Sequence, residues 1–453
     1  MKKRLPALVA ILFLLVVWEM IAWSVNKPEI VPSAFRLLRA LGELVVSGTF
    51  YQAVGVTILR GLTGISFSLA AACGFAFLFS RYRWLYEFFR PVFVIMRSVP
   101  VVSFILLALI YLHPESIPLL IAFLIMFPLL TENLTKGLFQ LRPGLKAMAD
   151  TFLIKRGNRL LHIYYPQLKP FLFSGLASAM GFGWRAIIMG EALSQCSFGI
   201  GSEMKRAQIF IDAPELIAWT IIAVLIGFVF DKTISWLETI QIPFKWATKD
   251  NFQFIVSPAI VMENICFAYP DTPVLSDFTY TFREDTIYGI SAPSGGGKTT
   301  LLNLINGTLI PAKGNIQIDR SRGIACVFQE AELLPHLSVL DNVMLPLTSF
   351  FTKETAIRTT DKTVTALDIA SLTDKRPNEL SYGQQQRVAI ARALTFPSPI
   401  LLLDEPFKGL DETLIQRIIA YIKERQAEKN QTIIFTTHKQ EELSLLADVI
   451  IHL

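Results

Sequence analysis

Apolar runs of about 20 residues recur before residue 240, and they constrain the fold of this chain more than any other feature. A run of that length matches an α-helix that crosses the hydrocarbon core of a bilayer. Hydrophobic residues make up 52% of the 453 residues and charged residues only 17%, which is too apolar for an ordinary soluble protein. The sequence therefore predicts an all-α membrane domain with six transmembrane helices, near residues 5–23, 61–80, 91–112, 117–135, 171–190 and 214–236.

The first apolar run follows a basic cluster at residues 1–4, and a signal peptide is the alternative interpretation. The run is longer than the apolar region of a signal peptide, and no small-residue cleavage site follows it. We therefore expect a first membrane helix whose amino end is held in the cytoplasm by the basic cluster.

Lysine and arginine residues are distributed among the loops as expected for a membrane protein whose two ends are cytoplasmic. Arg81, Arg83 and Arg90 lie between the second and third runs, and seven basic residues lie between the fourth and fifth. The loop at 113–116 carries none, whereas the loop near 191–213 holds two and follows the rule imperfectly. Membrane orientation thus explains the net charge of +5, and we expect contact with membrane lipid and no nucleic-acid binding.

The composition changes after about residue 240. Residues 241–257 lose the apolar run, and we interpret them as a linker between a membrane domain at 1–240 and a second domain at 258–453. In the second domain short β-branched strands alternate with helices, which predicts an α/β fold with a mainly parallel sheet. The four cysteines are far apart, so the sequence favours neither a disulfide framework nor a metal cluster.

A glycine-rich phosphate loop lies between an expected strand at 286–291 and an expected helix at 299–306. Backbone N–H groups of such a turn bind phosphate oxygens, Lys298 adds a positive charge, and Thr299 offers a hydroxyl to Mg²⁺. Ala292 replaces the first glycine of the motif, so either the backbone there keeps a negative φ or the entrance of the phosphate loop has a slightly altered geometry. A chance glycine-rich loop is the alternative. The predicted ATP-binding residues of this α/β P-loop domain are Ala292, Pro293, Ser294, Gly295, Gly296, Gly297, Lys298, Thr299 and Thr300.

Two adjacent acids follow the apolar residues 400–403. Asp404 would stand at the carboxyl end of a strand, where it can hold a metal ion, and Glu405 suits a general base for an attacking water. A buried structural pair is the alternative, although two adjacent acids behind leucines are costly without a cation.

Residues 380–384 read Leu-Ser-Tyr-Gly-Gln and stand between the phosphate loop and the acidic strand. This string, and the order of the three motifs along the chain, resemble those of the ATP-binding cassette ATPases, over roughly residues 260–450. The resemblance implies that two ATPase domains enclose two ATP molecules, so Ser381, Gly383 and Gln384 would complete the site of a second chain. Tyr382 replaces the more usual glycine, and residues 408–411 depart from the usual Ser-Ala-Leu-Asp.

The same resemblance assigns roles to residues outside the phosphate loop. Tyr269 would stack on adenine, with a core aromatic as the alternative, and Gln329 would contact Mg²⁺, with a surface glutamine as the alternative. His438 would contact the γ-phosphate, although a lone histidine is usually structural. The resulting catalytic set is Glu405, His438 and Lys298, and the resulting Mg²⁺ set is Thr299, Gln329 and Asp404.

The membrane half resembles the permeases of binding-protein-dependent importers, in the branch that takes up nitrate, sulfonates, taurine and thiamine-precursor pyrimidines. Such permeases carry a cytoplasmic coupling helix, which would fall at residues 147–149, with Leu153 where the family has glycine. An unrelated amphipathic loop helix is the alternative. The resemblance rests on short strings at residues 31–33, 57–60, 98–100, 183–185, 190–191 and 231–238.

Arg185 and Glu191 are ionisable residues within or at the end of the fifth span, where a charge is rarely found without a role. We expect Arg185 to face a translocation pathway and Glu191 to anchor an outer gate or meet a binding protein. An arginine that reaches the bilayer surface or pairs with an acid on another span is the alternative.

Together these patterns predict an ATP-driven importer in the inner membrane, with a cytoplasmic ATPase domain, working as a homodimer with a separate extracytoplasmic substrate-binding protein. An exporter half-transporter shares the domain order, but its membrane region is usually longer. A mechanotransmitter ATPase that moves no solute is a third interpretation, and six spans with few extracytoplasmic residues argue against it.

Overall fold

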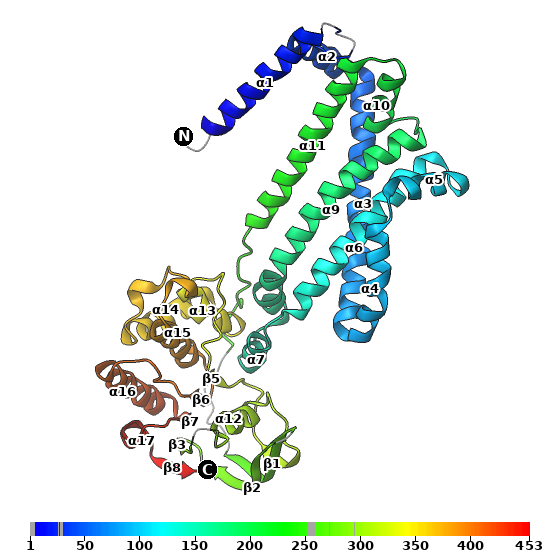
Figure 1. Ribbon diagram of the computed structural model, residues 1–453. Helices are drawn as coiled ribbons and strands as arrows, with labels where there is room; N and C mark the ends of the chain where they lie inside the picture. Colours follow the sequence, from blue (N-terminus) through cyan, green and yellow to red (C-terminus); the bar gives the residue numbers. More distant parts are fainter. Residues whose placement is uncertain (1–4, 26, 28–29, 252–258, 271, 294) are drawn as a thin grey trace. The chain divides into compact units, whose positions relative to one another are not determined.

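A computed structural model describes residues 5–453 except 26, 28–29, 252–258, 271 and 294. The chain forms two compact units, which Figure 1 shows as a set of long helices and a mixed α/β body. The first, here the helical unit, comprises Met1–Leu141 and Gln167–Gln241. The second, here the α/β unit, comprises Arg142–Pro166 and Ile242–Leu453. The loop at 142–166 therefore belongs to the α/β unit, although it lies inside the membrane half of the sequence. The end of the predicted linker, and Ser294 of the phosphate loop, fall outside the described residues.

The helical unit is built from nine α-helices in its described residues, several of them longer than the apolar runs alone predict (Figure 1). Its small residues allow close helix packing: a Cβ on Gly64 would lie 3.0 Å from the Cβ of Ala122 on a neighbouring helix. The helices are α1 Leu5–Val25, α2 Ala34–Val46, α3 Gly48–Arg81, α4 Arg83–Ser98, α5 Val101–Tyr111, α6 Ile117–Phe139, α9 Tyr165–Ser194, α10 Ile200–Ile209 and α11 Ala213–Thr239.

The prediction of six spans is not confirmed. Within the described residues four helices are long and apolar enough to cross a membrane, or five if one bent pair counts as a span. The predicted span at 91–112 is that pair, since α4 and α5 meet at an angle of 94°. Pro100 explains the break, because proline lacks an N–H and disfavours the helical conformation of the preceding Val99, which is extended.

The α/β unit contains the predicted parallel sheet, whose five strands are ordered β5-β6-β7-β3-β8. A smaller antiparallel sheet, ordered β2-β1-β4, accompanies it. Every residue of β6 and β7 is buried, which explains their near-continuous apolar sequences. The strands are β1 Ile260–Tyr269, β2 Thr272–Phe282, β3 Ile287–Ser291, β4 Lys313–Gln317, β5 Ala325–Val327, β6 Ile400–Asp404, β7 Thr432–Thr436 and β8 Val449–His452.

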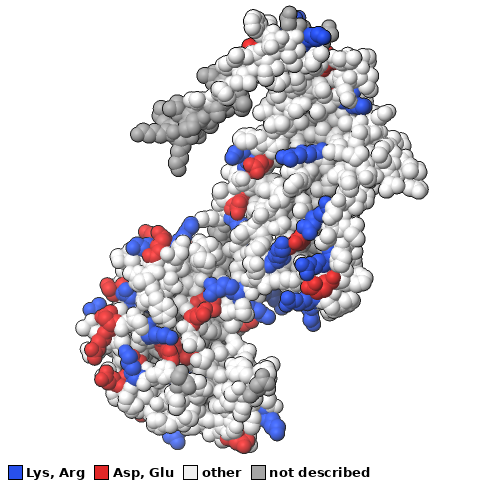
Figure 2. Space-filling model, in the orientation of Figure 1, with Lys and Arg blue, Asp and Glu red and all other residues white. Residues whose placement is uncertain are grey.

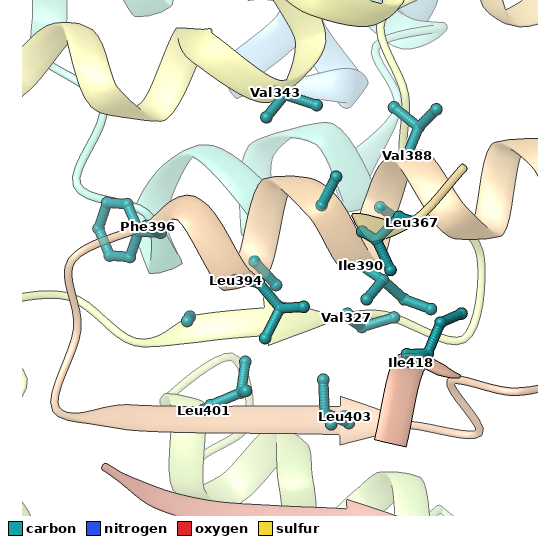
Figure 3. Close-up of a cluster of buried hydrophobic side chains, with 14 of the residues drawn as sticks. Val327, Val343, Leu367, Val388, Ile390, Leu394, Phe396, Leu401, Leu403 and Ile418 are labelled. Atoms are coloured by element: carbon teal, nitrogen blue, oxygen red, sulfur yellow. The ribbon is translucent and has the colours of Figure 1, made fainter. Parts of the chain in front are cut away.

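Helix α15 joins the sheet to the helical part of this unit. Figure 3 shows Ile390 and Leu394 of α15 above Val327 of β5 and Leu403 of β6, in a cluster of fully buried aliphatic side chains. This packing fixes the helix that carries the Ser-Tyr-Gly-Gln string at its amino end. The helices of the unit are α7 Pro143–Thr151, α8 Arg156–Arg159, α12 Lys298–Asn306, α13 Val339–Met344, α14 Lys353–Ala366, α15 Tyr382–Thr395, α16 Glu412–Lys429 and α17 Gln440–Leu446.

Charged side chains are spread unevenly over the two units. Figure 2 shows wide uncharged areas on the helical unit, whereas Lys, Arg, Asp and Glu are intermixed over the α/β unit. That difference is expected when one unit is solvated by lipid and the other by water.

Candidate nucleotide site and its connection to the permease loop

The phosphate loop runs from the end of β3 to the start of α12. Gly295 and Gly297 have φ values of +81° and +85°, a conformation that glycine adopts without steric cost. Ala292 lies outside that left-handed region, so alanine is compatible with the turn at this position. A Cβ on Gly296 would lie 2.9 Å from the Cβ of Ala292, so the crowding falls on Gly296 instead.

Lys298 begins α12 and extends into the concave side of the loop. Its Nζ donates to the carbonyl oxygens of Ala292, at 2.7 Å, and Pro293, at 3.1 Å. The same Nζ lies 3.3 Å from Nδ1 of His438, which follows β7. The lysine is only 6% exposed, so a largely desolvated ammonium stands against the phosphate loop, held by two of its carbonyl oxygens. An anion is the partner that this arrangement favours.

Asp404 ends β6 and is 4% exposed. Its Oδ1 accepts a hydrogen bond of 2.7 Å from the hydroxyl of Thr436 on the neighbouring strand. Burial raises the pKa of this carboxyl, and the charge of Glu405 acts in the same direction, while Thr436, Thr299 and Lys298 oppose the shift. Because burial disfavours the ionised carboxylate, a bound cation would stabilise that charged form. Carboxylate oxygens are hard ligands of the kind that Mg²⁺ prefers.

Glu405 is held by both its backbone and its side chain. Its φ of +44° is unusual for a residue with a side chain, and such strain often marks functional sites. The backbone N–H donates to Thr436 Oγ1 at 3.1 Å, and the carboxylate forms an ion pair with Nε2 of His438. Thr436 therefore orients both acids at once, a role that the sequence analysis did not assign.

A cavity of about 430 Å³ collects most of the predicted nucleotide-binding residues. Tyr269 lines it and is 47% exposed, which excludes a core position for this aromatic ring. Gln329 also lines it and is exposed. The lining residues are Tyr269, Thr272, Val274, Gly295, Gly296, Gly297, Lys298, Thr299, Thr300, Gln329, Glu405 and His438.

Ser381 is the N-cap of α15 and does not belong to that lining. Its hydroxyl accepts from the N–H of Gln384, and the Gln384 side chain accepts from the N–H of Ser381 at 2.9 Å, a reciprocal capping box. Gly383 lies in the same first turn. These residues are thus preorganised at an exposed helix amino end and separate from the phosphate loop of the same chain, as an action on a second chain requires.

The two departures from the usual signature and its following loop are in direct contact. Gly409 has a φ of +76°, and a Cβ there would lie 3.1 Å from Cδ1 of Tyr382. A larger residue at 382 therefore faces a smaller one at 409. We interpret the two changes as compensating, because the tyrosine ring occupies the space that an alanine side chain at 409 would need.

The loop at 142–166 contains the predicted coupling helix, and it packs on the α/β unit. The N–H of Ile324 donates to the carbonyl of Thr151 at 3.0 Å, and Asn158 Nδ2 donates to Thr348 Oγ1 at 2.8 Å. Leu153, which stands where the family has glycine, has a φ of +48°. The backbone therefore keeps the left-handed turn for which glycine is suited, and leucine adopts it at a steric cost.

Arg392 near the end of α15 is the principal residue that the sequence analysis missed. It is 1% exposed, and its Nη atoms donate to the carbonyls of Glu332 and Ala331, each at 2.7 Å. Its guanidinium lies 5.6 Å from the ring centroid of Phe152 in the permease loop. Burial lowers the pKa of Arg392 to about 10, so it stays charged at neutral pH. An arginine within a helical run of alanines and aliphatic residues was the available signal.

Glu332 connects this arginine to the permease loop a second time. Its carboxylate lies 3.1 Å from Nη2 of Arg142, and a Cβ on Gly144 would collide with that carboxylate. Burial raises the pKa of Glu332, while the charge of Arg142 opposes the shift. The residues after Gln329 are thus fixed between the signature helix and the first turn of α7.

In the helical unit, Glu191 is fully buried and serves as a shared acceptor. Its carboxylate accepts from Thr57 at 2.9 Å, from Arg60 at 2.7 Å and from the N–H of Gly201 at 2.9 Å. Arg60 also pairs with Glu115. Glu191 therefore ties α3, α9 and α10 together and is itself buried in this conformation, and its predicted role in anchoring an outer gate or meeting a binding protein stays a prediction. The partner Arg60 was not identified from the sequence.

Comparison with known proteins agrees with this geometry. Residues 275–408 match the family model described as ABC transporter, and residues 64–244 match that of the binding-protein-dependent transport system inner membrane component. The spermidine/putrescine import ATP-binding protein PotA of Legionella pneumophila is 37% identical over 207 residues, covering 44% of this chain and 57% of PotA. The Fe(3+) ions import ATP-binding protein FbpC 1 of Rhizobium meliloti is 35% identical, with 44% and 59% covered.

Among solved structures, a dimeric ATP-binding cassette, MJ0796, bound to ADP and Pi shares 29% identity with a TM-score of 0.41, covering 43% of this chain and 94% of that one. The two family matches define the class of the molecule, a membrane permease joined to an ATP-binding ABC ATPase domain. The chain thus carries a segment of each family, fused in one multi-pass inner-membrane protein whose ATPase domain is cytoplasmic. The chain spans a little more than half the length of the curated relatives it matches.

Proposed function

We propose that the protein is an ATP-driven importer of a small solute that a separate extracytoplasmic binding protein delivers. One observation carries the proposal: the loop at 142–166 lies inside the permease family match and packs within the α/β unit that carries the nucleotide cavity. A change at the phosphate loop can thus reach the permease through packed side chains. The nitrate, sulfonate, taurine and pyrimidine branch remains our preferred cargo range, from the resemblance of the membrane half.

In the proposed mechanism the chain's own residues bind and orient ATP. Lys298 and the loop amides hold the β- and γ-phosphates, and Tyr269 stacks on adenine. Glu405 takes a proton from the attacking water, and His438, paired with Glu405, holds that carboxylate and faces the γ-phosphate. Mg²⁺, when bound, neutralises phosphate charge, and its ligands would be Thr299, Gln329 and Asp404. Asp404 is buried and raised in pKa, which fits a residue that awaits a cation.

Direction of transport separates the competing functions. The purified chain and its binding protein would be reconstituted into liposomes with a solute that native mass spectrometry finds on the binding protein. Movement of that solute toward the ATPase side, dependent on ATP, supports the importer. Movement away from the ATPase side would favour an exporter, and stimulated hydrolysis without movement would favour a mechanotransmitter.

We also propose that two copies act together, with Ser381 of one completing the phosphate site of the other. Chains with Lys298→Ala, mixed with chains carrying Ser381→Arg, should recover about one working site per mixed dimer, because one site then keeps both halves intact. Mixed dimers isolated through two different tags would be assayed for ATP hydrolysis against each parent. Mixed dimers no more active than either parent would contradict the arrangement.

A further inference from the structure

Helices α9 and α11, with Met204 of α10, line an open cavity of about 550 Å³ in the helical unit. That volume lies in the range of about 300–1,000 Å³ typical of small-molecule sites. Its walls are mainly apolar and include Met180, Trp184 and Phe228. Trp184 is fixed in place, because its Nε1 donates to the carbonyl of Ala223 on α11 at 2.9 Å. The indole therefore forms a rigid wall between the two helices.

Two opposite charges line the same cavity, Arg185 from α9 and Asp231 from α11. Both side chains are exposed, and neither forms an ion pair or hydrogen bond with another residue in the described part of the chain. In Figure 2 charged groups of both signs interrupt the uncharged surface over α9 and α11. Arg60 differs, since it meets two carboxylates. An unpaired charge in a membrane span costs about 2.5–3.5 kcal/mol, so a polar partner would stabilise each group.

We propose that this cavity binds the transported solute, and that the solute is a small molecule with an anionic end and a cationic end. The guanidinium of Arg185 presents a planar fork of donors to the anion, and the carboxylate of Asp231 accepts from the cation. The apolar body of the solute lies against Trp184 and Phe228. This inference rests on the proposed transport function and narrows its cargo range, because taurine carries both charges whereas nitrate and simple sulfonates carry only the anion.

Gly181 offers a way to fill the cavity without disturbing the helices. It lines the cavity, and a Cβ there would meet no atom within 4 Å. A leucine at 181 therefore extends into the cavity without a clash at its Cβ. Gly74 of α3 is a matched control, because a Cβ there also meets nothing within 4 Å and it lies outside the cavity lining.

The test measures binding of three probes to the full chain in lipid nanodiscs by saturation-transfer NMR. 6-Aminohexanoate carries both charges on an apolar chain, hexanoate carries only the anion, and hexylamine carries only the cation. We expect 6-aminohexanoate to bind saturably at millimolar concentration and each singly charged analogue about tenfold or more weakly, as for loss of a hydrogen bond to a charged group. Arg185→Gln should abolish the advantage of 6-aminohexanoate over hexylamine, and Asp231→Asn its advantage over hexanoate.

Gly181→Leu should weaken binding of 6-aminohexanoate, and Gly74→Leu should leave it unchanged. The proposal is overturned if 6-aminohexanoate shows no saturable binding, or if the two charge variants leave the ratios between probes unaltered. It is also overturned if Arg185→Gln or Asp231→Asn converts dimers to monomers, since these groups would then pair with a second copy. Because binding is measured without ATP, its failure beside intact ATP-dependent transport would reject the cavity assignment alone.

Discussion

Replacing Arg392 by methionine tests how strongly the signature helix is joined to the permease loop. The change removes two hydrogen bonds of 2.7 Å from a charged group and a ring contact with Phe152. Carbonyls left without partners cost about 1–3 kcal/mol each, and the ring contact contributes up to about 2 kcal/mol. The lowered pKa of Arg392, about 10, represents a burial cost of roughly 3 kcal/mol that methionine avoids. The expected net destabilisation is about 2 kcal/mol.

The assay is thermal unfolding of the full chain in nanodiscs, following the transition that ATP raises. For a domain of this size 1 kcal/mol corresponds to about 2–4 °C, so Arg392→Met should lower that transition by about 4–8 °C. Arg392→Lys should lower it less, because an ammonium keeps the charge and can still donate to a carbonyl. Arg417→Met is the control, since Arg417 lies exposed on α16. A shift no larger than that of Arg417→Met would refute the reasoning.

Four further outcomes are expected. Glu405→Gln should keep ATP binding and slow hydrolysis by about 10²–10⁴, the range for loss of a general base, and wild-type turnover would contradict its role. Without Mg²⁺ the free energy of unfolding should fall as pH rises from the ordinary aspartate pKa to the raised pKa of Asp404, because in that range only the unfolded state has an ionised Asp404. Asp404→Asn should lack this fall in the free energy of unfolding. Gly409→Ala should cost about 1–2 kcal/mol, less in a Tyr382→Gly background, as a double-mutant cycle of unfolding would report. Leu153→Val should destabilise the fold by about 1–2 kcal/mol and Leu153→Asn should be tolerated, because β-branched residues fit a positive φ worst. Equal melting temperatures for these two variants would count against strain at that turn.

The sequence alone determined the parts of this protein that depend on local pattern. The phosphate loop, the acidic strand and the parallel sheet follow from residue order, because a strand, a glycine turn and a helix are specified within a few residues. Apolar runs identified membrane helices for the same reason. The predicted number of six spans is not confirmed, and the hydropathy pattern gave no sign of the 94° bend between α4 and α5 at Pro100.

Only the tertiary structure decided which distant residues meet. Arg392 with Ala331 and Glu332, Thr436 with both acids, and Tyr382 with Gly409 are contacts between segments that no local pattern relates. The loop at 142–166 is the clearest case, since its sequence belongs to the permease and its packing belongs to the α/β unit. Burial and pairing set the energies of charged groups, and both are properties of the folded chain rather than of the residue order.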